Sequence, residues 1–111
     1  MEYKDFKIEI YLPEGYIEDM RKELNDMGAC RVGDYDNVIS FSEVKGYWRP
    51  LESTTPFHGN KGDINFGSEC KMEIRCGISY IKNVLDKIYE IHPYEEPLVN
   101  VIPLINSYFR E

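Results

Sequence analysis

The sequence contains an internal repeat, and this repeat constrains the fold more than any other feature. The segment Lys7–Ile10 returns as Lys71–Ile74, at an offset of 64 residues, the difference between Lys7 and Lys71. The same offset carries one apolar helical stripe onto another, taking Tyr16, Ile17, Met20, Leu24 and Met27 onto Tyr80, Ile81, Val84, Ile88 and Ile91. A strand and the buried face of the following helix recur in register, which favours duplication over a chance match of apolar periodicity.

Apolar periodicity predicts the elements of each half. Alternation with a period of two indicates half-buried strands, and spacings of three and four indicate amphipathic helices. Strands are predicted at residues 6–12, 38–44, 71–76 and 98–104, and helices at residues 17–27 and 81–91. Gly28 and Pro93 end the two helices. The order β-α-β-β-α-β predicts an α+β fold, a ferredoxin-like split sandwich with two helices on one face of an antiparallel sheet.

Composition indicates one domain and excludes some classes of partner. The chain has 111 residues, of which 42% are hydrophobic, enough for one core, so residues 1–111 are expected to form a single domain. Twenty acidic against thirteen basic residues give a formal net charge of -7. This charge repels phosphate backbones and no basic cluster offsets it, so we expect no nucleic-acid binding.

The sequence also predicts where the protein resides. No apolar run approaches the length of a membrane span, and residues 1–6 lack the pattern of a signal peptide. The cysteines, Cys30, Cys70 and Cys76, are odd in number and lack paired spacing. This set is typical of reduced thiols. We therefore expect a cytoplasmic protein that does not enter a membrane.

Residues 45–69 are predicted to form a long loop, rich in glycine and carrying two prolines. Loops of this length in compact domains are uncommon and often functional. One interpretation is a flap whose aromatic side chains cover the sheet edge. The other is a binding loop in which Arg49 meets an anion and Trp48 stacks on it. His58, in the same loop, is more typical of a surface histidine than of a ligand.

The segment His92–Pro97, with sequence HPYEEP, is the second unusual stretch. A histidine at the end of a helix complements the helix dipole, and Pro93 stops the helix, so the segment is explained as a turn into the last strand. The alternative is that His92, Glu95 and Glu96 converge on a metal or polar ligand. The two histidines lack a recognisable nucleophile context, so the sequence nominates no catalytic residues.

Several motifs, taken together, resemble a known family. They are Gly33-x-Tyr35-Asp36, Gly46-x-Trp48-Arg49-Pro50, Pro56-Phe57-x-Gly59-x-x-Gly62, Glu69-x-Lys71-x-Glu73 and His92-Pro93-Tyr94-Glu95-Glu96-Pro97. In this order they resemble the YqfO-type domain, which is inserted in many NIF-three-like (dinuclear metal centre) proteins and also occurs alone. The His-Pro-Tyr-Glu ending is similar to that of CutA, the divalent-cation-tolerance protein. The resemblance implies a PII/CutA-like, trimer-forming ferredoxin fold.

What the resemblance implies about activity is narrower. The metal ligands of NIF-three-like proteins lie in domains that flank this one, so it implies neither their dinuclear site nor a hydrolase activity here. Two functional hypotheses follow. The first is a non-catalytic, homo-oligomeric PII/CutA-like module, trimeric by resemblance, that binds a small ligand or protein partner in a regulatory or scaffolding role. The second is a divalent-metal-binding protein of CutA type. An enzyme is the weakest hypothesis, and no cofactor other than a divalent metal is expected.

A site, if present, is predicted where the long loop meets the His92–Glu96 turn. The expected ligand-binding residues are Trp48, Arg49, His92, Tyr94, Glu95 and Glu96. The expected metal ligands, under the second hypothesis, are His92, Glu95, Glu96 and His58. A structural alternative is that Arg49 pairs with Glu95 or Glu96 and only pins the loop to the turn.

Overall fold

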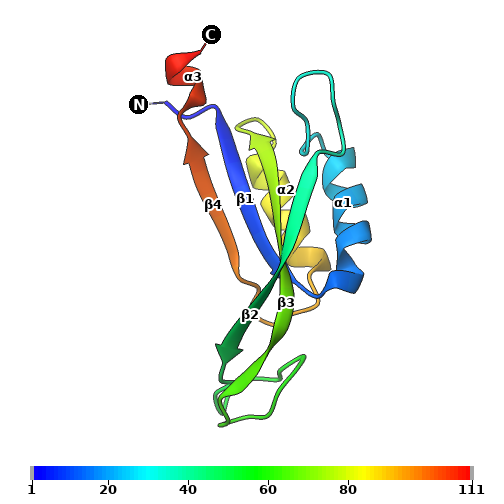
Figure 1. The fold of residues 1–111 in the computed structure, drawn as a ribbon, viewed down its shortest axis with the longest axis vertical. Helices are drawn as coiled ribbons and strands as arrows, with labels where there is room; N and C mark the ends of the chain where they lie inside the picture. The colour runs from blue at the N-terminus through cyan, green and yellow to red at the C-terminus, as the bar shows by residue number, and fades with distance from the viewer. Residues whose placement is uncertain (1, 111) are drawn as a thin grey trace.

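The computed structural model describes residues 2–110 and confirms the predicted order of the main elements (Figure 1). The strands are β1 (Asp5–Leu12), β2 (Ile39–Trp48), β3 (Asn65–Gly77) and β4 (Val99–Leu104). The helices are α1 (Ile17–Asp26), α2 (Ile81–Ile91) and the short α3 (Asn106–Phe109), which the sequence did not predict. A single 3-10 turn, Glu14–Tyr16, leads into α1.

The four strands form one sheet in the order β2-β3-β1-β4, and every neighbouring pair is antiparallel. Helices α1 and α2 lie side by side on one face of this sheet (Figure 1). This arrangement is the ferredoxin-like split sandwich, so the predicted fold class is confirmed. Pro103 lies in β4, an edge strand, where the missing backbone donor need not break a ladder.

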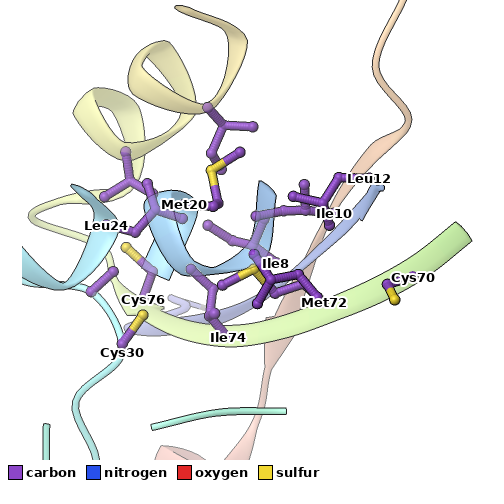
Figure 2. Close-up of a cluster of buried hydrophobic side chains, with 14 residues drawn as sticks. Ile8, Ile10, Leu12, Met20, Leu24, Cys30, Cys70, Met72, Ile74 and Cys76 are labelled. Atoms are coloured by element: carbon purple, nitrogen blue, oxygen red, sulfur yellow. The ribbon is translucent and has the colours of Figure 1, made fainter. Parts of the chain in front are cut away.

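The core lies between the sheet and the two helices (Figure 2). Alternate residues of the two central strands are buried against one residue from each successive turn of the helices. The fully buried side chains include Ile8, Ile10, Leu12, Met20, Leu24, Met72, Val84 and Ile88. Each contributes about 1.5–3 kcal/mol of transfer free energy. Ile17 and Ile81, the first residues of the two helices, both pack against this cluster. The two repeats therefore direct equivalent side chains to one core, as the offset predicted.

The β2–β3 hairpin is longer than the sequence predicted. We expected a loop over residues 45–69, but β2 continues to Trp48 and β3 begins at Asn65. The connecting loop is residues 49–64, which we call the hairpin loop. Strand β3 pairs with β1 only from Cys70 onward, so the outer part of the hairpin is a two-stranded arm beyond the rest of the sheet (Figure 1).

Glycine and aromatic residues, which suggested a loop, are strand residues in the arm. Gly46 and Gly67 lie opposite each other, and Tyr47 pairs with Phe66 across the strands with ring centroids 4.9 Å apart. Trp48 lies over Gly67, where a Cβ would stand 3.2 Å from its ring. Glycine in a strand often marks such a close approach. The cross-strand aromatic pair and the Trp48 contact therefore explain why the strands extend here.

The sheet face opposite the helices is uncovered and carries charged side chains. Lys7 Nζ lies 2.9 Å from Glu73 Oε1 and 3.3 Å from Glu9 Oε2. Lys71 Nζ lies 3.9 Å from Glu9 Oε2. Alternation along the strands thus separates an apolar face from a charged one, as expected for a half-covered antiparallel sheet.

The ends of the sheet differ in what they carry. Asp5, the first residue of β1, is paired with Leu104, the last residue of β4. The strand that starts the fold and the strand that closes it therefore meet at one end of the sheet, whereas the hairpin loop lies at the other end (Figure 1). None of the helices within residues 2–110 has the length and apolar character needed to cross a membrane.

Candidate functional site

A cavity of about 460 Å³ lies where the hairpin loop meets the turn between α2 and β4. Its walls are mainly apolar and aromatic, and its rings are Tyr11, Tyr47, Trp48, Phe57, His58 and Tyr94. The charged groups on its walls are Arg49, Glu69, Glu95 and Glu96. The volume falls in the range of small-molecule pockets, and a few polar groups on apolar walls are typical of them. We call this cavity the loop pocket.

The loop pocket is built partly on the uncovered face of the sheet. Leu12 and Cys70 point into the core, so their neighbours Tyr11 and Glu69 lie on the opposite face. Register along β2 and β3 places Trp48 on that same face. The end of β1 and the arm therefore form the floor of the pocket, and the hairpin loop and the turn supply its sides.

His92 holds the turn through both of its ring nitrogens. Nε2 lies 2.7 Å from the Tyr11 carbonyl oxygen, to which it donates, and Nδ1 accepts the Tyr94 backbone N–H at 3.1 Å. Only the neutral imidazole protonated at Nε2 satisfies both partners. Burial lowers the pKa of His92 and so favours this neutral form, although the bond to Tyr11 opposes the shift. His92 is therefore a positioning residue for the turn, and its Nδ1 lone pair is already engaged.

Tyr94 and Glu69 join the turn to β3. The Tyr94 hydroxyl donates to Glu69 Oε1 at 3.0 Å. Burial, followed by the negative charge of Glu69, raises the pKa of Tyr94. The phenol consequently stays protonated and continues to donate, which fixes one carboxylate oxygen of Glu69.

The hairpin loop is attached to the turn by Glu95 and by an aromatic contact. Glu95 Oε1 accepts the Thr55 backbone N–H at 2.8 Å. Phe57 makes an edge-on contact with Tyr16, at a centroid distance of 6.3 Å, and lies 5.7 Å from the Tyr94 ring. Trp48 Nε1 donates to the His58 carbonyl oxygen at 3.1 Å, closing the base of the loop. The loop is therefore held in a folded-back position.

Arg49 does not have the pinning role that we considered. Within residues 2–110 it forms no ion pair, and Glu95 instead holds the backbone of Thr55. The loop is pinned, but by a carboxylate on the turn and a backbone donor on the loop. Arg49 remains an exposed cation on the wall of the loop pocket.

The structure brings most of the expected ligand-binding residues together. Five of the six, Trp48, Arg49, Tyr94, Glu95 and Glu96, line the loop pocket, whereas His92 does not line it. For the expected metal set, no three histidine, cysteine, aspartate or glutamate side chains in the described part of the chain are grouped so that they could hold an ion. His58 lines the pocket, and its ring lies 4.6 Å from the Phe57 ring at an interplanar angle of 58°.

Sequence reasoning missed Tyr11, Glu69 and Phe57 as residues of the site. Alternation does place Tyr11 and Glu69 on the uncovered face, but it does not indicate which end of a strand meets the loop. Phe57 belongs to one of the loop motifs, but the sequence gives no indication that its ring contacts Tyr16 and Tyr94. Knowledge of the strand register would have found the first two, because β1 and β3 adjoin here.

The fold of this chain is a ferredoxin-like fold of the kind found in CutA and PII-like proteins. The divalent cation tolerance protein CutA of Archaeoglobus fulgidus superposes with a TM-score of 0.66 at 19% identity, covering 90% of this chain and 83% of that one. GlnK of Bacillus subtilis superposes with a TM-score of 0.62 at 21% identity, over 91% of this chain and 84% of that one. At these identities the likeness concerns the fold.

In sequence the chain is related to NIF-three-like proteins, which confirms the resemblance to the YqfO-type domain. It is 32% identical over 98 residues to a GTP cyclohydrolase 1 type 2 homolog of Bacillus subtilis, covering 88% of this chain and 26% of that protein. A Bacillus cereus protein related to NIF3 superposes with a TM-score of 0.78 at 28% identity, over 92% of this chain and 26% of that one. The chain thus spans about a quarter of the length of these relatives. No family model matches it.

Proposed function

We propose that this chain is a non-catalytic, homo-oligomeric binding module with a regulatory or scaffolding role, and that it holds a small organic ligand in the loop pocket. The observation that supports the proposal is the pocket itself, because the hairpin loop and the turn together enclose an aromatic cavity. Trp48 and Tyr94 supply ring faces, Glu95 and Glu96 supply acceptors, and Arg49 supplies a cation at the wall. His92 keeps the turn in place.

The state of the nucleophilic side chains supports a non-catalytic role. Burial raises the pKa of the Cys30 and Cys76 thiols to about 11, and it also raises that of Cys70. Protonated, buried thiols are poor nucleophiles. His92 is neutral and engaged at both nitrogens, so it is not available as a general base.

The way the loop is held supports a regulatory role. One carboxylate bond, from Glu95 to Thr55, and the Phe57 contacts keep the hairpin loop folded back. Exposed contacts of this kind are worth about 1 kcal/mol each. A ligand that contacts both the loop and the turn would therefore change the position of the loop at small energetic cost. A partner protein that binds the two loop positions with different affinity would respond to that change.

Exposed edges and aromatic side chains support the homo-oligomer. Strands β2 and β4 are the free edges of the sheet. Tyr47 and Phe66 on the arm and Phe109 near the end of β4 are at least 60% exposed. Unpaired edges with exposed rings favour pairing between copies. We propose a trimer, the number implied by the fold resemblance; light scattering should give three times the 13.1 kDa mass of the chain. A monomer mass at micromolar concentration would contradict it.

A thermal-shift screen with metabolites and divalent metals tests the binding function. Trp48 is the only tryptophan, so its fluorescence confirms that a hit acts at the loop pocket. Arg49→Ala should leave the melting temperature unchanged, because Arg49 holds no ion pair, and should change the affinity of the hit. Lys45→Ala removes a cation on β2, four residues before Arg49 and outside the pocket, so it is the matched control and should change neither. Absence of any hit, or a hit equally unaffected by both variants, would contradict the proposal.

A further inference from the structure

The charges around the loop pocket are unbalanced. Three carboxylates, Glu69, Glu95 and Glu96, line it together with one guanidinium, that of Arg49. None of these four groups forms an ion pair within residues 2–110, in contrast with the paired charges on the uncovered face of the sheet. Three carboxylates against one guanidinium leave the pocket with an excess of negative charge, in a chain whose formal net charge, these groups included, is -7.

Two of the carboxylates are fixed in position by one oxygen each. Glu69 Oε1 accepts the Tyr94 hydroxyl, and Glu95 Oε1 accepts the Thr55 N–H. No hydrogen bond among the described residues engages the Oε2 atom of either group. A carboxylate held by one oxygen is oriented and can still accept from a ligand through the other. These groups are thus preorganised acceptors.

The rings of the pocket favour the same sign of ligand charge. The electron-rich faces of tryptophan and tyrosine attract cations, and Trp48 is the strongest of these groups. Trp48 is seated against Gly67 and is tied by its Nε1 to the His58 carbonyl, so its ring is fixed rather than free to collapse into the cavity. Tyr94 is similarly fixed through Glu69. Rings and carboxylates together form an environment for a positive group on an apolar body.

From these features we propose that the ligand of the loop pocket is an organic ammonium or guanidinium cation carried on an apolar or aromatic body. The inference rests on the proposed function and adds the chemical class of the ligand. Its cationic group would meet Glu69, Glu95 and Glu96, and its body would lie on the Trp48 ring. A phosphate ester is disfavoured, because three carboxylates oppose it and one exposed arginine assists it.

Three compounds with the same phenyl ring and different charge test this class directly. They are phenethylamine (cation), phenethyl alcohol (neutral) and hydrocinnamate (anion), with ATP as the phosphate-bearing competitor. Titration followed by Trp48 fluorescence should give phenethylamine a dissociation constant of about 1 mM, as expected for so few atoms. Phenethyl alcohol should bind about fivefold more weakly, and hydrocinnamate at least about tenfold more weakly. Added salt should weaken only the amine.

Charge variants give effects of opposite sign. Glu96→Gln removes a wall carboxylate that has no hydrogen-bond partner in the described chain, so the fold is undisturbed, and it should weaken phenethylamine about fivefold. Arg49→Gln removes the cation that repels the ligand and should raise the affinity for phenethylamine about twofold. Glu52→Gln, an exposed glutamate of the same loop that does not line the pocket, is the matched control and should leave binding unchanged.

Each alternative outcome decides the question. Preference for hydrocinnamate or ATP over phenethylamine, with Trp48 responding, would overturn the cation inference and leave a small-ligand pocket standing. Equal effects of Glu96→Gln and Glu52→Gln would also overturn it, because the attraction would then not come from the pocket. No response of Trp48 to any of the four compounds would overturn it too. If Trp48 does not respond and the thermal-shift screen also finds no ligand, the proposed function would be overturned as well.

Discussion

Replacing His92 tests the way the turn is built. His92→Ala removes a side chain that is only 8% exposed and that satisfies two backbone groups, the Tyr11 carbonyl and the Tyr94 N–H. Leaving a buried polar group without its partner costs about 1–3 kcal/mol. With two such groups and a partial cavity, we expect the free energy of unfolding to fall by about 3 kcal/mol. That loss corresponds to roughly 10 °C in melting temperature for a domain of this size.

The pH dependence gives an independent check on the protonation state. The pKa of His92 is lowered in the folded protein, so the unfolded chain binds the proton more readily. The stability due to neutral His92 is complete above the unfolded pKa, about 6.5, and is lost as the pH falls from there toward the folded pKa. The native protein should therefore lose stability over this interval. His92→Ala should lack that part of the slope.

His58→Ala is the matched control, since His58 is the second of the two histidines and is exposed. Urea unfolding followed by circular dichroism, at one protein concentration, would compare the three proteins. The control should lie within about 0.5 kcal/mol of the native protein and keep its pH slope. Equal stability of the two alanine variants, or a native stability that rises on acidification, would refute the role assigned to His92.

Three further predictions follow from the fold and its charge. Gly28→Ala should destabilise the protein by roughly 1–3 kcal/mol, because φ is +100° there and a Cβ would stand 2.9 Å from the Tyr80 ring. Gly15→Ala is the control, since Gly15 has open space around it and no positive φ. Equal melting temperatures of the two variants would contradict this account. Iodoacetamide should label Cys30 and Cys76 slowly in the native protein and quickly in denaturant, since burial raises the pKa of both to about 11; fast native labelling would count against burial. Fluorescence anisotropy should detect no binding to duplex or single-stranded DNA at physiological salt, and a salt-sensitive rise at low micromolar protein would show the charge argument wrong.

The architecture was predictable because it depends on periodicity. The 64-residue offset, the difference between Lys7 and Lys71, aligns two strands and two helical faces, and residues aligned in this way must share one core. The contact between the hairpin loop and the turn after α2 was also expected from the sequence, and Glu95 and Thr55 make it in the structure. These inferences use only local pattern and chain order.

What could not be predicted depends on contacts between distant residues. The arm was read as loop because Gly46 and Gly67 are weak strand formers taken singly; their pairing with each other, beside Tyr47 and Phe66, appears only in the folded register. The bond from Glu95 to the Thr55 N–H likewise has no sequence signal, because a backbone donor is the same at every residue. Charge alone favoured Arg49 as the partner of Glu95. In the folded chain the backbone N–H of Thr55 is the group that lies within hydrogen-bond distance of Glu95.

The pairing of Asp5 with Leu104 has a consequence for the way this module is carried in longer polypeptides. A host chain that enters at β1 and leaves after β4 does so at adjacent points, so it need not stretch or reroute to accommodate the insertion. The hairpin loop lies at the far end of the sheet (Figure 1), so the loop pocket that it lines would face away from such a host chain. The matching segment makes up 26% of the Bacillus subtilis relative, and two adjacent connections would be enough to carry such a segment within so long a chain.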